Sequence, residues 1–250
     1  MKFLVTNDDG IHAPGLHALA YELKRLGEVY VVAPDRPRSA TGHSITLHKP
    51  LRLAQITLPN GIPAWMSNGT PSDCVVLGMS EQMGGAPDMV ISGINPGPNL
   101  GEDLTYSGTV SAAMEGTIFG KPSFAISVAG FGQLDFSPAA RFAARLAKAV
   151  SDHGLPKNTL LNVNVPALPE AQLVGVSITR QARRRYQSRL EKRTDPRGVD
   201  YYWLGGELLE DENPEGTDTA AIEQNRISIT PIHLDLTEYS FLKELQTWNI

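Results

Sequence analysis

Short apolar runs recur through the first half of the chain, and polar or glycine-rich stretches follow them. The clearest runs lie within residues 3–5, 29–33, 88–92 and 124–128. A run in which polar and apolar residues do not alternate is typical of a parallel strand that is covered on both faces. These runs therefore predict the buried strands of a mostly parallel sheet.

Helical spacing connects the first two of these runs. Leucine and alanine recur every three or four positions after Pro14, which suits the first turn of a helix, and Gly27 ends the pattern. A strand, a helix and a strand within about 33 residues form a βαβ unit, whose crossover is expected to be right-handed. The pattern thus predicts an α/β protein in which helices flank the sheet.

Further helices and strands are predicted later in the chain. Thr70 is a candidate N-cap with Asp73 as its capping-box partner, and that helix is expected to run to about Met83. Residues 138–150 are rich in alanine and predict another helix.

Three segments are predicted to be extended on weaker patterns. Residues 45–58 predict a hairpin, with prolines that favour sheet edges. Residues 160–165 alternate between polar and apolar, which places them at or near a sheet edge, and residues 227–232 predict a late strand.

The composition fits a globular protein of this class, with 250 residues of which 41% are hydrophobic and 20% charged. This length allows one large α/β domain or two small ones. The formal net charge of −5 gives no general attraction to polyanions. We therefore expect no nucleic-acid polymer as a partner, because binding one would need a strong local basic patch.

The sequence also predicts where the protein resides. Cys74 is the only cysteine, so no internal disulfide can form. No N-terminal stretch combines a basic start, an apolar core and a cleavage site, and no run of about 18 apolar residues could span a bilayer. We expect a soluble, cytoplasmic protein that does not bind a membrane.

Candidate chemistry begins where the first predicted strand ends, at Asp8 and Asp9. Open α/β sheets build their ligand sites at the carboxyl ends of strands. Two carboxylates about 4 Å apart at an effective dielectric constant of about 20 repel by roughly 4 kcal/mol, which corresponds to about three pKa units. Either one of the pair is protonated or a cation lies between them. The alternative is that one aspartate caps the following helix while the other is solvated.

Two other oxygen donors follow strand ends. Ser39 lies in the polar loop after the second strand, and Asn95 follows the third run. Carboxylate, hydroxyl and amide oxygens suit Mg²⁺ or Mn²⁺, whereas the histidines show no spacing that would support a zinc site. The predicted metal ligands are thus Asp8, Asp9, Ser39 and Asn95, and such a cation could support phosphate ester hydrolysis.

The densest loop of the chain covers residues 93–109, which are rich in glycine and asparagine. A helix that starts at Ser107, Gly108 and Thr109 presents unpaired N–H groups and the positive end of its dipole, which can bind a phosphate-sized anion. An ordinary serine or threonine N-cap is the alternative. A loop of about 17 residues at a strand's carboxyl end is more often functional than idle.

Charged residues separate the last part of the chain from the rest. Residues 180–193 carry seven Arg or Lys against one Glu, and residues 207–223 carry seven acidic residues and no basic one. Blocks of opposite charge indicate an exposed arm that pairs with itself or with a neighbouring subunit. Two solvated faces are the alternative.

Several motifs together resemble the SurE family, the stationary-phase survival 5′/3′-nucleotidases. They are L-V-T-N-D-D-G-I at the N-terminus, the S-G-I-N-P-G-P-N-L-G-E-D loop and the Y-S-G-T-V-S-A-A-M-E-G helix start. N-G-T-P-S-D-C-V and L-L-N-V-N-V-P extend the likeness over residues 1–180, and E-G-T-D-T-A-A and I-T-P-I-H-L-D-L continue it more weakly.

The resemblance implies a Rossmann-like α/β core over residues 1–180 and, over residues 181–250, a projecting C-terminal arm with closing segments used in oligomerisation. It also implies a phosphatase that needs one divalent cation, Mg²⁺ or Mn²⁺, and hydrolyses nucleoside 5′- and 3′-monophosphates, with short polyphosphate as a further substrate. By analogy Asp8, Asp9, Ser39 and Asn95 hold the metal and Ser107, Gly108 and Thr109 receive the phosphate. Asp8 and Asp9 are the catalytic residues, and a homodimer or homotetramer is expected.

Two other functions remain open from the residues alone. A nucleotide-sugar-dependent transferase can begin with a similar strand and helix, although 250 residues leave little room for a second complete doubly wound domain. A non-catalytic nucleotide-binding protein, which would bind a nucleotide without hydrolysing it, is the other alternative.

Overall fold

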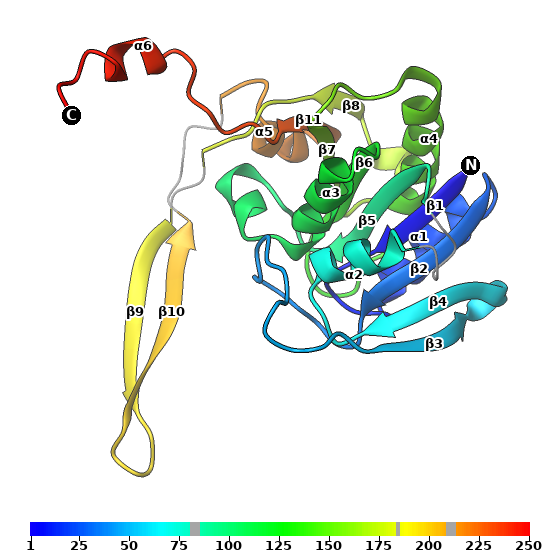
Figure 1. Cartoon of the computed structure of the whole chain (residues 1–250), viewed down its shortest axis with the longest axis horizontal. Helices are drawn as coiled ribbons and strands as arrows, with labels where there is room; N and C mark the ends of the chain where they lie inside the picture. The colour runs from blue at the N-terminus through cyan, green and yellow to red at the C-terminus, as the bar shows by residue number, and fades with distance from the viewer. Residues whose placement is uncertain (81–85, 184–185, 209–213) are drawn as a thin grey trace.

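A computed structural model describes residues 1–80, 86–183, 186–208 and 214–250. The described residues form a nine-stranded sheet in the order β3-β4-β2-β1-β5-β6-β7-β11-β8, and a separate two-stranded sheet of β9 and β10 (Figure 1). The strands of the main sheet are β1 (Lys2–Thr6), β2 (Glu28–Pro34), β3 (Leu53–Leu58), β4 (Ile62–Ser67), β5 (Met89–Pro96), β6 (Ser123–Ala129), β7 (Thr159–Pro166), β8 (Gly175–Ile178) and β11 (Arg226–His233).

The helices alternate with these strands, so the predicted α/β class is confirmed. They are α1 (Pro14–Leu23), α2 (Pro71–Gly78), α3 (Gly108–Ile118), α4 (Ser137–His153), α5 (Asp218–Glu223) and α6 (Leu242–Leu245), with short 3₁₀ helices η1 (Pro59–Gly61), η3 (Gly101–Thr105) and η4 (Glu170–Gln172). Strands β4, β2, β1, β5, β6 and β7 run parallel to one another, whereas β3 and β11 pair antiparallel with β4 and β7.

Helices cover both faces of the sheet. Helices α1 and α4 pack together on one face, and α2 and α3 pack together on the other (Figure 1). Phe3 and Val5 of β1 belong to the core on the α1 side, while Leu4 between them belongs to the core on the α2 side. Because successive side chains of a strand point to opposite faces, a strand covered on both sides needs the unbroken apolar run seen in the sequence.

The start of α2 forms as predicted, but its end does not. Thr70 accepts a hydrogen bond from the Asp73 N–H, and the Asp73 side chain accepts one from the Thr70 N–H, which completes the capping box. The helix ends at Gly78, before the expected end near Met83, and Met83 itself lies outside the described residues.

One prediction of extended structure is wrong. The hairpin is not within residues 45–58: it joins β3 to β4 across η1, and β4 continues the sheet by pairing with β2. Strand β7 lies near one edge of the sheet but not at it, because β11 and then β8 lie outside it. The polar members of its alternation, Asn162 and Asn164, are fully buried. The predicted late strand is confirmed as β11.

The C-terminal part contains both a projection and a return to the core. Strands β9 (Tyr186–Thr194) and β10 (Asp200–Leu208) form an antiparallel hairpin that projects from the body, as the predicted arm (Figure 1). Helix α5 and β11 then rejoin the main body, and the last residues with α6 extend away from it (Figure 1). No helix among the described residues is long and apolar enough to cross a bilayer.

Candidate functional site

The site lies where the strand order reverses. From β1 the sheet grows through β2 in one direction and through β5 in the other. Open α/β sheets form a crevice outside the carboxyl ends of the two strands at such a switch point. Asp8 and Asp9 follow β1, and Asn95 lies near the end of β5.

A cavity of about 420 Å³ opens at this crevice, and it brings the four predicted metal ligands together. Its lining consists of Asp8, Asp9, Ser39, Ala40, Asn95, Pro96, Gly97, Pro98, Asn99, Asp103, Tyr106, Ser107 and Phe131. Of the three residues predicted to receive phosphate, Ser107 therefore lines the cavity, whereas Gly108 and Thr109 do not.

The turn after β1 is shaped by Asn7. Its side chain accepts a hydrogen bond from the Gly10 N–H at 3.2 Å and donates one to the Gly10 carbonyl at 3.1 Å. Gly10 has a φ of +99°, which side-chain-bearing residues rarely adopt. Asn7 and Gly10 thus fix the turn that carries the two aspartates.

Asp8 is buried against the first turn of α3. The Thr109 hydroxyl donates to Asp8 Oδ1 at 2.5 Å, and Thr109 is fully buried. A Cβ on Gly108 would lie 2.7 Å from Asp8 Cβ and 3.0 Å from Oδ2, so only glycine allows this approach. Gly108 and Thr109 hold Asp8 in place, and the Thr109 hydroxyl is directed to that carboxylate.

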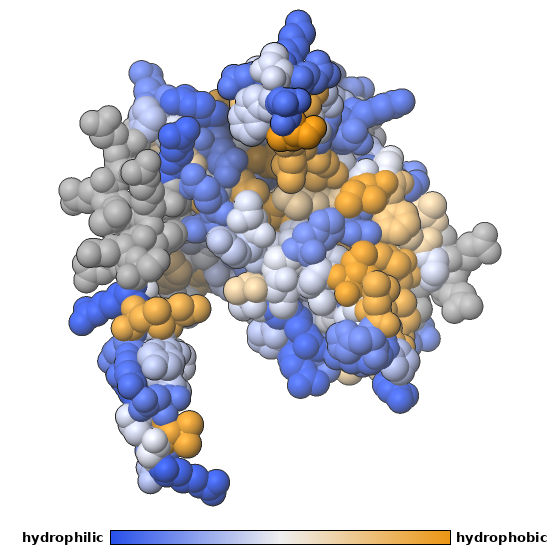
Figure 2. All heavy atoms as spheres, turned by 60° about the vertical axis from the view of Figure 1, so that its left-hand side comes forward, coloured by the Kyte–Doolittle hydropathy of each residue, from blue (hydrophilic) through white to orange (hydrophobic). Residues whose placement is uncertain are grey.

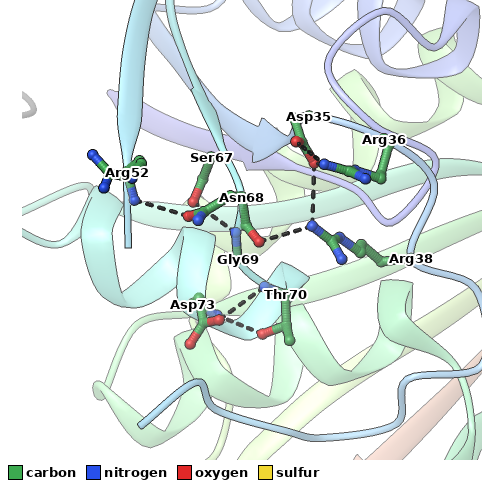
Figure 3. Close-up of polar contacts among 9 residues, drawn as sticks. All are labelled: Asp35, Arg36, Arg38, Arg52, Ser67, Asn68, Gly69, Thr70 and Asp73. Atoms are coloured by element: carbon green, nitrogen blue, oxygen red, sulfur yellow. Dashed lines mark hydrogen bonds and ion pairs between the residues drawn. The ribbon is translucent and has the colours of Figure 1, made fainter. Parts of the chain in front are cut away.

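The loop that carries Ser39 is anchored from both ends. The Arg38 N–H donates to the Asp8 carbonyl at 2.7 Å. The Arg38 guanidinium donates to the Asn68 carbonyl at 2.8 Å and to Asp35 at 3.2 Å (Figure 3). Further along, the Gly42 N–H donates to the Tyr106 carbonyl at 3.1 Å. These bonds bring Ser39 next to the turn after β1.

Asn95 is presented by an irregularity in the sheet. The register between β5 and β6 shifts between Gly93 and Asn95, and bulges of this kind change the direction in which a side chain points. The Asn95 Nδ2 donates to the Gly97 carbonyl at 2.7 Å, which leaves Oδ1 as the group for a ligand. The predicted loop over residues 93–109 is therefore shorter than expected, because its first residues continue β5.

The wall of the cavity at Asn99 is held by the two asparagines of β7. The Asn164 Oδ1 accepts from the Asn99 N–H at 2.8 Å, and the Nδ2 groups of Asn162 and Asn164 both donate to the Asn99 carbonyl. This structural role of Asn162 and Asn164 was not predicted from the sequence. The N-V-N spacing could have indicated it, because it places both amides on one face of the strand.

The same wall is tied to the base of the arm. Asp218 Oδ2 accepts from the Gly101 N–H at 2.9 Å, and Oδ1 accepts from the Ala182 N–H at 3.0 Å. The Gln181 side chain donates to the Gly101 carbonyl at 3.0 Å. The residues just before the hairpin and those just after it therefore both hold η3, which borders the cavity.

The carboxyls of Asp8 and Asp9 both have raised pKa values. Burial is the cause at Asp8, and the Thr109 hydrogen bonds oppose it. Burial and then repulsion from Asp8 raise the pKa of Asp9 to about 7 from the ordinary 3.8. Without a neutralising group the pair does not carry two full charges at neutral pH.

The donor set fits a divalent cation. Asp9 Oδ2 is buried and has no hydrogen-bond partner, and a buried carboxylate oxygen without a partner is costly. Two carboxylates with a hydroxyl and an amide oxygen are the hard ligands that Mg²⁺ or Mn²⁺ takes. In the part of the chain that the structure describes, no group of three or more His, Cys, Asp or Glu could hold a metal. A site here would accordingly be completed by Ser39 and Asn95.

The fold and the cavity define an α/β protein with a paired-carboxylate ligand site at the switch point of its sheet. Residues 3–188 match the family model described as "Survival protein SurE", and the chain belongs to the SurE family.

The chain is similar to proteins of this family over its full length. A protein of Heliobacterium modesticaldum named 5′-nucleotidase SurE is 51% identical, covering 99% of this chain and 92% of that protein. One of Geobacter sulfurreducens with the same name is 53% identical, covering 100% and 94%. The crystal structure of the SurE protein from Aquifex aeolicus is 44% identical with a TM-score of 0.86, covering 98% of each chain.

Replacing Thr109 by Val tests how Asp8 is held. Valine keeps the shape but removes the hydroxyl, so the free energy of unfolding at pH 8 should fall by about 1.5–3 kcal/mol, the usual contribution of a hydrogen bond to a charged group. Thr109→Ser keeps the hydroxyl and should stay closer to the wild type in urea denaturation. Equal losses in both variants would contradict the contact.

The raised pKa of Asp9 predicts a pH-dependent stability in the presence of a chelator. The folded protein holds a proton between pH 4 and about 7 that the unfolded chain has released, so this group's contribution to the unfolding free energy falls as pH rises through that range. Asp9→Asn removes the titration. The variant should therefore gain stability relative to the wild type between pH 5 and about 7.5, measured by urea denaturation, and a constant difference would refute the shift.

Proposed function

We propose that this protein is a divalent-metal-dependent phosphatase that hydrolyses nucleoside 5′-monophosphates to nucleoside and phosphate. The observation that carries the proposal is the unpartnered Asp9 Oδ2 beside buried Asp8, in a cavity that Ser107 at the start of α3 also lines. The names of the curated relatives support the 5′-nucleotidase activity. Nucleoside 3′-monophosphates and short polyphosphate are proposed as further substrates.

The cation is proposed to be Mg²⁺ or Mn²⁺, held by Asp8, Asp9, Ser39 and Asn95. These residues supply only two formal negative charges, so the ion would keep positions open for water and substrate. When bound, it would polarise a phosphate oxygen and activate a water molecule for attack.

The chain's own groups supply the remaining steps. The Ser107 hydroxyl and the N-terminal end of α3 would bind phosphate oxygens, since Ser107 lines the cavity and helix N-termini attract anions. Asp8 is held by Thr109 and is proposed to orient the cation, whereas Asp9 is proposed to take the proton from the attacking water with whichever carboxylate oxygen the cation does not use.

Asp9→Asn tests the proposal directly. The variant should lose at least a thousandfold in the kcat for phosphate release from AMP with Mn²⁺, because one charge and one proton acceptor are removed. Asp152→Asn is the matched control, since Asp152 lies on the exposed surface of α4. Phosphate would be measured in saturating Mn²⁺ and in chelator, with circular dichroism to verify folding.

The same assay separates the alternatives. A nucleotide-sugar-dependent transferase would leave AMP intact and act on a sugar nucleotide, and a nucleotide-binding protein without activity would bind AMP and release nothing. Near-normal turnover in Asp9→Asn, or turnover that a chelator leaves unchanged, would contradict the metal-dependent phosphatase.

We also propose that the arm joins copies of this chain into a homodimer or homotetramer. The described hairpin exposes large apolar side chains, including Leu190, Trp203 and Leu204, the last of which is 88% exposed. Figure 2 shows hydrophobic residues (orange) on the surface of the projecting hairpin. Apolar surface of this kind on a projecting element favours burial against a partner. The C-terminal residues expose Leu236 and Ile250 in the same way.

Trp203→Glu combined with Leu204→Glu should shift the protein to a smaller species in sedimentation velocity, because charge would have to be buried at the contact. Arg197→Glu, in the exposed turn between β9 and β10, is the control for added negative charge. An unchanged sedimentation coefficient in the double variant would remove the hairpin from the interface.

A further inference from the structure

The mouth of the cavity carries two aromatic rings that the reaction itself does not need. Phe131 is 86% exposed and Tyr106 is 68% exposed, yet both line the same cavity as Asp8, Asp9 and Ser107. Exposed aromatic rings in water lose the stabilisation that burial would give them. Their position beside a polar cavity therefore calls for a ligand group that covers them.

The two rings come from different segments of the chain. Tyr106 is the C-cap residue of η3. Its carbonyl accepts a hydrogen bond from the Gly42 N–H, in the loop that carries Ser39. Phe131 lies beside Gly97, where an added Cβ would be 3.6 Å from the Phe131 ring, and the Gly97 N–H is itself bonded to the Val128 carbonyl. The rings thus belong to two different walls of one cavity.

We propose that Tyr106 and Phe131 bind the base of the nucleotide by stacking, an inference that rests on the proposed nucleotidase function. With the phosphate at the polar floor near Asp9 and Ser107, the nucleoside extends toward the mouth, where the rings offer flat apolar faces. The strength of stacking depends on the size of the planar base and not on its hydrogen-bonding groups. Purine nucleotides should therefore be preferred to pyrimidine nucleotides, with little distinction between adenine and guanine.

A second cavity next to the site is the competing place for the base. It measures about 450 Å³, shares Asp9 and Pro96 with the first cavity, and is lined by Leu134 and Phe136. Those two side chains already pack against the main core, so their apolar surface is largely used. The rings of Tyr106 and Phe131 are much more exposed, so they offer more apolar surface for the base to cover.

The test compares kcat/KM for AMP, GMP, CMP and ribose 5-phosphate, which lacks a base. In Phe131→Ala and in Tyr106→Ala, the ratio of kcat/KM for AMP to that for ribose 5-phosphate should fall about tenfold, equivalent to about 1.4 kcal/mol and within the range for base stacking. Phe131→Tyr keeps an aromatic face and should retain the wild-type ratio. Phe119→Ala is the control, because Phe119 is also exposed but lies at the far end of α3.

Each outcome decides between the two cavities. An unchanged ratio in both alanine variants overturns the proposal, as does a ratio that changes only in Leu134→Ala. If the wild type releases phosphate from none of the compounds, the nucleotidase function fails separately. Calorimetric binding of AMP against ribose 5-phosphate to the same variants then decides the stacking: a tenfold loss of AMP affinity supports it, and none refutes it.

Discussion

The site depends on one constraint, which is that two adjacent carboxylates are taken out of water at the end of β1. Desolvation and mutual repulsion both disfavour this arrangement, so the surrounding structure has to hold it. The first turn of α3 does so with the Thr109 hydroxyl and with the close approach that Gly108 permits. A doubly charged ion bound by this pair, as proposed, would relieve the destabilisation.

Separate contacts position the other predicted metal ligands and the wall of the cavity next to this pair. The Arg38 backbone links the Ser39 loop to Asp8, a bulge in β5 presents Asn95, and the amides of β7 fix the Asn99 segment. Arg38, Asn162 and Asn164 do not themselves line the cavity. The geometry of the site is consequently a property of the whole sheet edge, and residues with no direct contact to a ligand contribute to it.

The sequence was sufficient for the parts of this arrangement that follow from local rules. Unbroken apolar runs identified β1, β2, β5 and β6, and because the carboxyl ends of parallel strands meet at one edge, the grouping of Asp8, Asp9, Ser39 and Asn95 could be predicted. Contacts between distant segments could not be predicted from the sequence. The sequence does not show that the Thr109 hydroxyl reaches Asp8. Nor does it show that the polar positions of β7, which predicted a strand at or near a sheet edge, are two buried amides bonded to Asn99.

The place of β11 in the sheet has a consequence for biosynthesis. It lies between β7 and β8, although β8 precedes it by nearly fifty residues in the chain. During translation, therefore, β7 keeps an open edge and β8 has no neighbour until residues 226–233 leave the ribosome. Asp218, which bonds Gly101 across a separation of 117 residues, arrives equally late. The nascent chain must therefore shield one edge of β7 while residues 167–225 are synthesised, and the Gly101 segment beside the cavity gains its Asp218 contact only when translation is almost complete.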